Sequence, residues 1–414
     1  MFYLLHEGGM GIIRLVLALS VVLWHLPLAS FRLINAHVAV VLFFIISGFY
    51  MAMVINEKYA RPEDPHWIRT FYLARVWRLY PAYLAMVGIM VIWFYATNTP
   101  TALVDRLPMS AFEQAILALS NVFMIGQDLH QFLVRIRVDH AGPQFLLNTV
   151  NRIGPEVLSE MAMLVGQAWS LAAEVLFYLM APFVVRSARS TAIALTVALA
   201  VRFALIGIFH QPSGVWGYYF FPGAVCMFLL GSASYHLGRS APFKDVHAHV
   251  GFLALAALLT CFIWTAAKDW VVMPSASDGS IDTPRFWALY ILFALSIPFI
   301  FQATKTVAFD REIGELSYPL YLVHGLVCGL VYYRWGGPKN ILPDACAAVL
   351  LSLMAAYIMH RFIELPADRF RQRMSNRPLA LKWGWATPAN TTITGLLVGL
   401  CRVAVRSIDE KSIR

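Results

Sequence analysis

The feature that most constrains this chain is a series of apolar segments long enough to cross a lipid bilayer. A transmembrane helix needs about 20 predominantly apolar residues, and lipid-exposed irregular backbone would leave polar groups unpaired. Ten segments meet that length: 11–30, 36–55, 78–96, 166–185, 190–210, 218–238, 250–267, 286–304, 315–333 and 340–363. The sequence therefore predicts an all-α, polytopic membrane helix bundle of ten transmembrane helices.

The composition agrees with a membrane protein. Of 414 residues, 59% are hydrophobic and 13% are charged, against about 45–50% and about 25% in soluble domains. The net charge of +9 does not indicate nucleic-acid binding, because the basic residues lie between apolar segments and form no single patch. The five cysteines are scattered without a CxxC pair. We expect them to be small buried hydrophobic residues, with neither a disulfide framework nor a metal site.

Basic residues between the segments predict the orientation in the membrane. The first segment lacks a small-residue cleavage site and reads as an uncleaved helix. With the N-terminus inside, twenty-two basic residues fall in cytoplasmic segments and nine on the other side. Such an excess predicts that both termini are cytoplasmic. The only long outer segment is 97–165, in which 111–127 is a weaker apolar run suited to an interfacial or re-entrant helix.

The chain is predicted to contain one membrane domain and a tail. The ten segments form a domain over 1–370, and 371–414 is the cytoplasmic tail. Within the tail, 393–405 is apolar but too short to span, which favours an interfacial helix.

Charged side chains inside apolar segments are costly in a bilayer, so they usually face a cavity or a partner and mark function. Arg14 and His25 share the first segment, where eleven residues of α-helix make about three turns and place both on one face, about 16 Å apart. Taken singly, an arginine at the position of Arg14 is more often a topology anchor than part of a ligand site. His25 taken singly is equally explained as an interfacial histidine bonded to a backbone carbonyl.

Two further features follow, one in the second segment and one in the stretch that leads from it into the third. Ser47 and Gly48 form a small spot where a helix or a thin ligand can approach closely, and plain helix packing also explains Ser47. Arg75 and Arg78 are three residues apart, so their guanidinium groups are neighbours on a helix and suit a phosphate or pyrophosphate. Anchoring to lipid headgroups is the alternative for this pair.

The later segments contain the remaining ionisable groups. Glu174 is a carboxyl group inside the fourth segment, suited to orient a histidine or to act as acid or base. The alternative is that Glu174 forms a buried structural ion pair with an arginine. Tyr321 and His324 are three residues apart and share a face of the ninth segment. His360 and Glu364 form an i, i+4 pair that favours a structural cap at the cytoplasmic interface.

The order of these features is more specific than any one of them. An Arg and His first helix is followed by FFIISGF, RVWRLYP, WSLAAEVLFY, ELSYPLYLVH and HRFIELP. In this order they resemble the integral-membrane acyltransferase family 3 (bacterial O-antigen, Nod-factor and exopolysaccharide acetyltransferases) over about residues 10–370. The resemblance implies a multi-pass protein of the bacterial inner membrane, with a cytoplasmic acyl-CoA donor, acetyl-CoA by default. It also implies an outer glycan acceptor such as an exopolysaccharide or lipopolysaccharide.

The resemblance also assigns roles to residues. Arg14 and His25 match the functional pair of the first helix, Arg75 and Arg78 match the RxxR motif, and Glu174 matches the fourth-helix glutamate. Some members carry an extracytoplasmic SGNH-type domain after the bundle. Only about fifty residues follow the core here, so we expect transfer by the bundle itself or with a separate extracytoplasmic transferase.

A mechanism follows as a hypothesis. Acyl transfer to a hydroxyl needs a general base and a stabilised oxyanion, and imidazole suits the first task near neutral pH. His25 is the predicted base, oriented by Glu174, with Arg14 beside the path of the thioester. The predicted donor ligands are Arg75, Arg78 and Ser47, while Tyr321 and His324 are substrate contacts or structural residues. Direct attack and a covalent acyl-enzyme, with Ser47 or Tyr321 as relay nucleophile, both fit.

Two other classes of protein remain open at this stage. Buried Arg, His and Glu also suit a transporter or a flippase of glycan or lipid intermediates, although broken helices and inverted halves are not evident. A membrane scaffold or sensor, whose loop arginines bind anionic lipid, is the third possibility. Consumption of a thioester would separate the enzyme from both.

Overall fold

A computed structural model describes residues 9–26, 33–60, 64–97, 111–128, 163–240, 248–267, 282–334 and 341–374. Every regular element in this part of the chain is a helix, which confirms the all-α prediction there. The chain divides into two compact units, Met1–Asp368 and Arg369–Arg414. The predicted interfacial helix at 393–405 lies outside the described residues.

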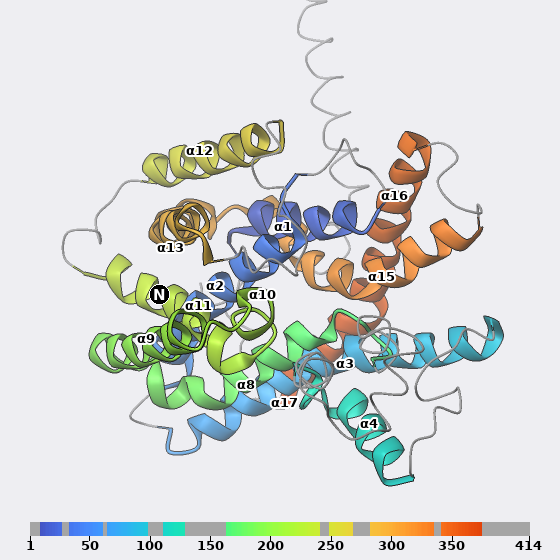
Figure 1. Cartoon of the computed structure of the whole chain (residues 1–414), viewed down its shortest axis with the longest axis horizontal. Coiled ribbons are helices and arrows are strands. Elements are labelled where there is room, and N and C mark those ends of the chain that lie inside the picture. The colour runs from blue at the N-terminus through green and yellow to red at the C-terminus, as the bar shows by residue number, and fades with distance from the viewer. Residues whose placement is uncertain are drawn as a thin grey trace, which may run out of the picture. The chain divides into compact units, whose positions relative to one another are not determined.

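The helices follow the predicted apolar segments (Figure 1). In chain order they are α1 (Gly11–Trp24), α2 (Ala36–Val54), η1 (Ile55–Tyr59), α3 (Trp67–Thr97), α4 (Ala111–Phe123), α8 (Ala168–Val184), α9 (Ala188–Phe203), η2 (Ala204–Ile208), α10 (Ser213–Trp216), α11 (Phe221–Gly238), α12 (Ala248–Ala267), α13 (Pro284–Thr304), α14 (Ala308–Glu315), α15 (Ser317–Arg334), α16 (Ile341–Met359), η5 (His360–Glu364) and α17 (Leu365–Met374). The η elements are π-helical turns that continue α2, α9 and α16.

Five helical stretches in the described residues are long and apolar enough to cross a membrane, judged by length and composition. They are Ala36–Tyr59, Trp67–Thr97, Ala188–Ile208, Pro284–Thr304 and Pro343–Arg371. Gly11–Trp24, Ala168–Val184 and His249–Ile263 are shorter apolar helices. The total of ten spans and the side of each terminus stay predictions.

Burial separates a central helix from peripheral ones. The apolar window of Ala36–Tyr59 is 89% buried, against 17% for Ala188–Ile208. α2 contacts α1, α8, α11 and α13 (Figure 1). The outer faces of peripheral helices instead expose large apolar side chains, such as Phe203 and Leu253. An exposed apolar surface of this kind suits contact with lipid chains.

The same distinction corrects the expectation for the cysteines. Cys226 and Cys328 are buried, but Cys261 and Cys346 are exposed on α12 and α16. An apolar residue on a membrane helix can face lipid instead of protein, so apolarity alone did not predict protein burial.

Two close helix contacts depend on glycine. A Cβ at Gly48 of α2 would lie 1.7 Å from the Phe228 carbonyl oxygen of α11, and Ser232 Oγ donates to the Gly48 carbonyl at 2.9 Å. A Cβ at Gly11 of α1 would lie 1.6 Å from the Asp310 carbonyl oxygen of α14. Only a residue without a side chain allows such close backbone approach.

Asp310 also caps the N-terminus of α1. Its two carboxylate oxygens accept from the Gly11 and Ile12 amides at 2.7 and 2.9 Å. These bonds satisfy amides that lack a partner within the helix, and the charge favours the positive end of the helix dipole. The cap fixes α1, and with it Arg14 one turn further along.

Arg202, which lies inside a predicted span, has a structural explanation. Its guanidinium group donates to both carboxylate oxygens of Asp282 at 2.9 Å and to the Gly217 and Gly223 carbonyls at 2.6 Å. The buried charge is therefore paired and hydrogen-bonded, and it ties α9 to the chain around α10 and α11.

Candidate active site

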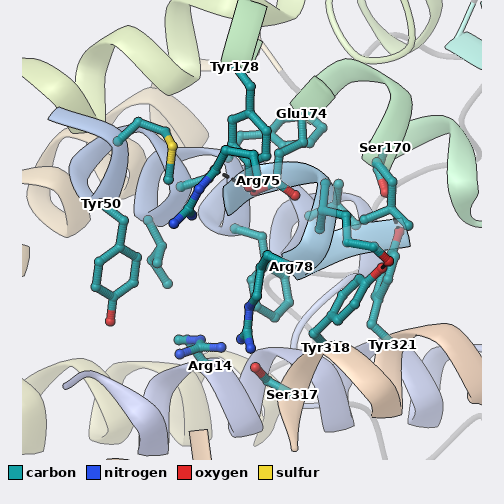
Figure 2. A pocket seen from close by; sticks show the side chains of 18 residues that line it. Arg14, Tyr50, Arg75, Arg78, Ser170, Glu174, Tyr178, Ser317, Tyr318 and Tyr321 are labelled. Atoms are coloured by element: carbon teal, nitrogen blue, oxygen red, sulfur yellow. Dashed lines mark hydrogen bonds between the residues drawn. The ribbon is translucent and has the colours of Figure 1, made fainter. Parts of the chain in front are cut away.

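The site is a cavity of about 840 Å³, including its open mouth, between α1, α2, α3, α8 and α15 (Figure 2). One face of α2 lines it, through Val40, Phe43, Ser47, Tyr50 and Met51. This stripe of residues spaced three or four apart runs about 16 Å along the helix axis. The cavity therefore suits a long, thin ligand.

Three arginines enter the cavity from two helices. Arg14 of α1 and Arg75 and Arg78 of α3 all line it, and Figure 2 shows their guanidinium groups on the same side. The centre of the Arg14 guanidinium group lies 6.0 Å from the Tyr50 ring centroid. Because Arg75 is 4% exposed, anchoring to lipid headgroups does not explain it. Three positive charges favour a polyanionic ligand at this end.

The two arginines of the RxxR motif have different surroundings. The Arg75 guanidinium centre lies 5.9 Å from the ring centroids of both Phe71 and Tyr178. Arg78 Nη1 instead donates to Glu315 Oε2 at 2.9 Å, at the junction of α14 and α15. The aromatic rings hold Arg75 in place, while Arg78 already contacts a carboxylate.

Glu174 lies in the middle of the lining and is held by two hydroxyl groups. Ser47 Oγ and Tyr178 OH each donate to its Oε1 atom at 2.6 Å. Tyr178 is one turn after Glu174 on α8, whereas Ser47 comes from α2. The next residue, Gly48, packs against α11 and does not line the cavity. Ser47 therefore serves the cavity, whereas Gly48 serves helix packing.

Another part of the cavity is lined by neutral hydroxyl groups. Tyr321 OH lies 2.7 Å from Ser170 Oγ, and the Phe43 and Tyr321 ring centroids are 6.3 Å apart. Gln167 Nε2 donates to the Leu322 carbonyl at 2.6 Å, which ties α8 to α15 here. Phe43 and Tyr50 are seven residues apart on α2, so this part lies about 10 Å from the Arg14–Tyr50 contact.

The two predicted histidines are brought together beyond this part of the cavity. His25 and His324 have ring centroids 5.0 Å apart, and neither is among the lining residues. His324 is 1% exposed, whereas His25 is exposed at the end of α1. His324 also lies beside Tyr321, with ring centroids 5.6 Å apart.

The structure gives His25 and Glu174 partners other than each other. His25 Nδ1 lies 2.8 Å from the Val21 carbonyl oxygen, and Glu174 Oε1 accepts from Ser47 and Tyr178. The histidine ring beside His25 belongs to His324, from α15. Periodicity placed each residue on a face of its own helix but gave no information on which helices are neighbours.

Other lining residues were not predicted from the sequence. Tyr50, Ser170, Tyr178, Ser317 and Tyr318 all line the cavity. Tyr178 could have been predicted from the sequence, because it lies four residues after Glu174 and therefore on the same face of the helix. The others carry no charge, and nothing in apolar segments distinguishes a cavity-facing hydroxyl from one bonded within its own helix.

The predicted pair at the end of α16 is confirmed. His360 Nδ1 and Glu364 Oε2 are 2.8 Å apart within the π-helical turn η5, outside the cavity lining. Among the described residues, no group of three or more His, Cys, Asp or Glu side chains could hold a metal ion.

The cavity geometry agrees with the motifs that suggested a membrane acyltransferase. The chain belongs to the acyltransferase 3 family, because that family's model, described as an acyltransferase domain, matches residues 8–361. The chain therefore contains an acyltransferase domain, and the apolar helices among its described residues agree with a membrane protein.

Two curated relatives are the O-acetyltransferases OatA of Staphylococcus aureus strains NCTC 8325 / PS 47 and COL. Each is 24% identical to this chain over 379 residues, covering 86% of the chain and 56% of the relative. The chain thus spans about half the length of the curated relatives it matches. No solved structure gives a significant match.

Proposed function

We propose that this protein is an O-acetyltransferase that moves an acetyl group from cytoplasmic acetyl-CoA to a hydroxyl of a cell-envelope or exported glycan. The observation that carries the proposal is the cavity, which has three arginines on one side and neutral hydroxyl groups elsewhere along α2. CoA has the matching chemistry, because its phosphates are joined to the thioester by a long, thin arm.

Each group of lining residues has a task in this proposal. Arg75 and Arg78 bind the donor phosphates, and Arg14 lies where the arm enters. Ser170 and Tyr321 present hydroxyl groups where the acyl group would lie. Both hydroxyl groups also bond to the Gln167 carbonyl, at 3.0 and 3.3 Å, so an O–H group would turn from that carbonyl to stabilise negative charge on the acyl oxygen during attack.

His25 is the proposed general base. Its Nδ1 bonds to the Val21 carbonyl, which leaves Nε2 without a proton in the neutral ring. Because the ring is exposed, an acceptor hydroxyl can reach it. Ser47 and Glu174 keep the alternative of an acyl-enzyme open, since the Ser47 hydroxyl donates to a carboxylate inside the cavity.

The proposal includes a location. We place the protein in the bacterial inner membrane as a multi-pass protein with both termini cytoplasmic, so that donor and acceptor arrive from opposite sides. Its partners are membrane lipid and a glycan acceptor. The last transfer is made by the bundle itself or by a separate extracytoplasmic transferase.

The test is release of free CoA from acetyl-CoA by purified protein in lipid nanodiscs, with envelope glycans as acceptors. We expect release that depends on the acceptor and is lost in His25→Ala, while donor binding remains. Folded protein that releases no CoA with any acceptor, acyl chain or added envelope fraction would contradict the proposal. Equal rates for His25→Ala and the parent would contradict the base assignment alone.

A further inference from the structure

One of the arginines at the donor end of the cavity already forms an ion pair with a carboxylate. Glu315 Oε2 accepts from Arg78 Nη1 at 2.9 Å, and the two side chains are 26% and 15% exposed. Arg78 lines the cavity, whereas Glu315 does not. The carboxylate therefore contacts the guanidinium group from outside the lining.

Glu315 stands at a junction between helices. It is the last residue of α14, and α15 begins at Ser317, which lines the cavity. The same short helix contacts α1 through Gly314, where an added Cβ would lie 2.7 Å from Gly11 Cα and 3.6 Å from Arg14 Nη1. Glu315 thus directly follows a residue that packs against the start of α1 and lies beside Arg14.

The charges explain why a carboxylate is stable here without a ligand. Arg14, Arg75 and Arg78 concentrate positive charge in one cavity, and Glu174 is the only carboxylate in the described lining. Like charges in a partly desolvated space repel, and Glu315 reduces that repulsion. A phosphate would satisfy the same guanidinium group by the same kind of charge-assisted hydrogen bond.

We propose that Glu315 is a positioning residue that competes with a phosphate of the acyl-CoA donor for Arg78. Donor binding displaces the carboxylate toward the half-exposed side of the junction. As the spent CoA dissociates, the Glu315 carboxylate takes the place of its phosphate on Arg78. This competition makes release of CoA faster. This inference rests on the proposed function, because it takes Arg78 as a donor ligand.

The experiment measures CoA binding to the full chain in nanodiscs by calorimetry. Glu315→Gln should lower the dissociation constant of CoA about fivefold at low salt, a difference that high salt reduces. Glu312→Gln is the matched control, because it removes the same charge from an exposed site on α14. In an Arg78→Gln background, Glu315→Gln should have no further effect, since the competition is gone.

Each outcome decides between the alternatives. An unchanged dissociation constant in Glu315→Gln, or a change matched by Glu312→Gln, overturns the competition. Weaker binding in Glu315→Gln also overturns it, because Glu315 would then orient Arg78 for the donor. A parent chain that binds no CoA overturns the proposed donor and this inference together, whereas a binding parent with an unaffected variant overturns this inference alone.

Discussion

The rings of His25, at the end of α1, and His324, on α15, lie beside each other, with centroids 5.0 Å apart and planes tilted by 53°. The Nδ1 atoms of both bond to backbone carbonyls, Val21 at 2.8 Å and Tyr321 at 2.7 Å. A carbonyl oxygen only accepts, so both protons sit on Nδ1 and each neutral ring keeps a lone pair on Nε2. The buried ring of His324 thus supports the exposed ring of the proposed base.

Replacing His324 should reduce turnover without affecting donor binding. When His25 takes up the acceptor proton, its positive charge lies beside the aromatic ring of His324. A cation beside an aromatic ring contributes about 0.5–1 kcal/mol at an exposed site, so His324→Leu should lower kcat roughly threefold. The measurement is acceptor-dependent CoA release, with the KM for acetyl-CoA determined alongside. Cys328→Ala, a buried change one turn along α15, is the control. Equal kcat in His324→Leu and the parent would remove His324 from the mechanism.

The two arginines of α3 should affect donor binding far more than a third arginine on that helix. Arg75→Gln should weaken CoA binding at least tenfold, because hydrogen bonds to charged groups contribute about 1.5–3 kcal/mol. Arg69→Gln should have little effect, since Arg69 is exposed and does not line the cavity. Calorimetric titration with CoA checks both. Similar losses in the two variants would point to general charge and not to a site.

The Ser47 and Tyr178 hydroxyl groups, which both donate to Glu174, should have coupled effects on the stability of the protein. Ser47→Ala and Tyr178→Phe each remove one bond to the same Oε1 atom, at about 1.5–3 kcal/mol each. Because they share a partner, the double variant should differ from the sum by at least about 0.5 kcal/mol. Thermal unfolding in detergent measures the cycle, with Ser296→Ala as control, since Ser296 bonds only within its own helix turn. Strict additivity would mean that the bonds are independent.

A methyl group at Gly11 should be far more damaging than one at Gly88. The new Cβ would lie 1.6 Å from the Asp310 carbonyl oxygen, so α1 and α14 must separate and the Asp310 cap is strained. We expect a loss of about 2 kcal/mol or more for Gly11→Ala. Gly88→Ala should be neutral or stabilising, because nothing lies within 4 Å of its Cβ and alanine favours a helix. Melting temperatures of both variants test the contact.

The orientation in the membrane is testable by reporter fusions. Reporters active only in the cytoplasm should work when fused after 60 or at the C-terminus, because the basic residues favour that side. Reporters active only outside should work when inserted within 268–281. The opposite pattern would reverse the membrane topology and with it the direction of transfer.

The sequence alone determined which segments are helices. Apolar length fixes this, since lipid forces the backbone to pair within each segment, and α2 and α13 lie where the pattern predicted them. It also identified all four charged residues of the described lining. Arg14 and Glu174 stand out because a charge in an apolar segment is costly, and Arg75 and Arg78 because they are three residues apart on one helix.

The tertiary structure decided which of these groups meet. His25 lies beside His324 and not beside Glu174, and Arg78 pairs with Glu315, which is 237 residues away in the chain. Periodicity gives the face of a single helix, but the neighbour of that face depends on packing. At Gly48 and Gly11 that packing is set by backbone contacts closer than any side chain would allow.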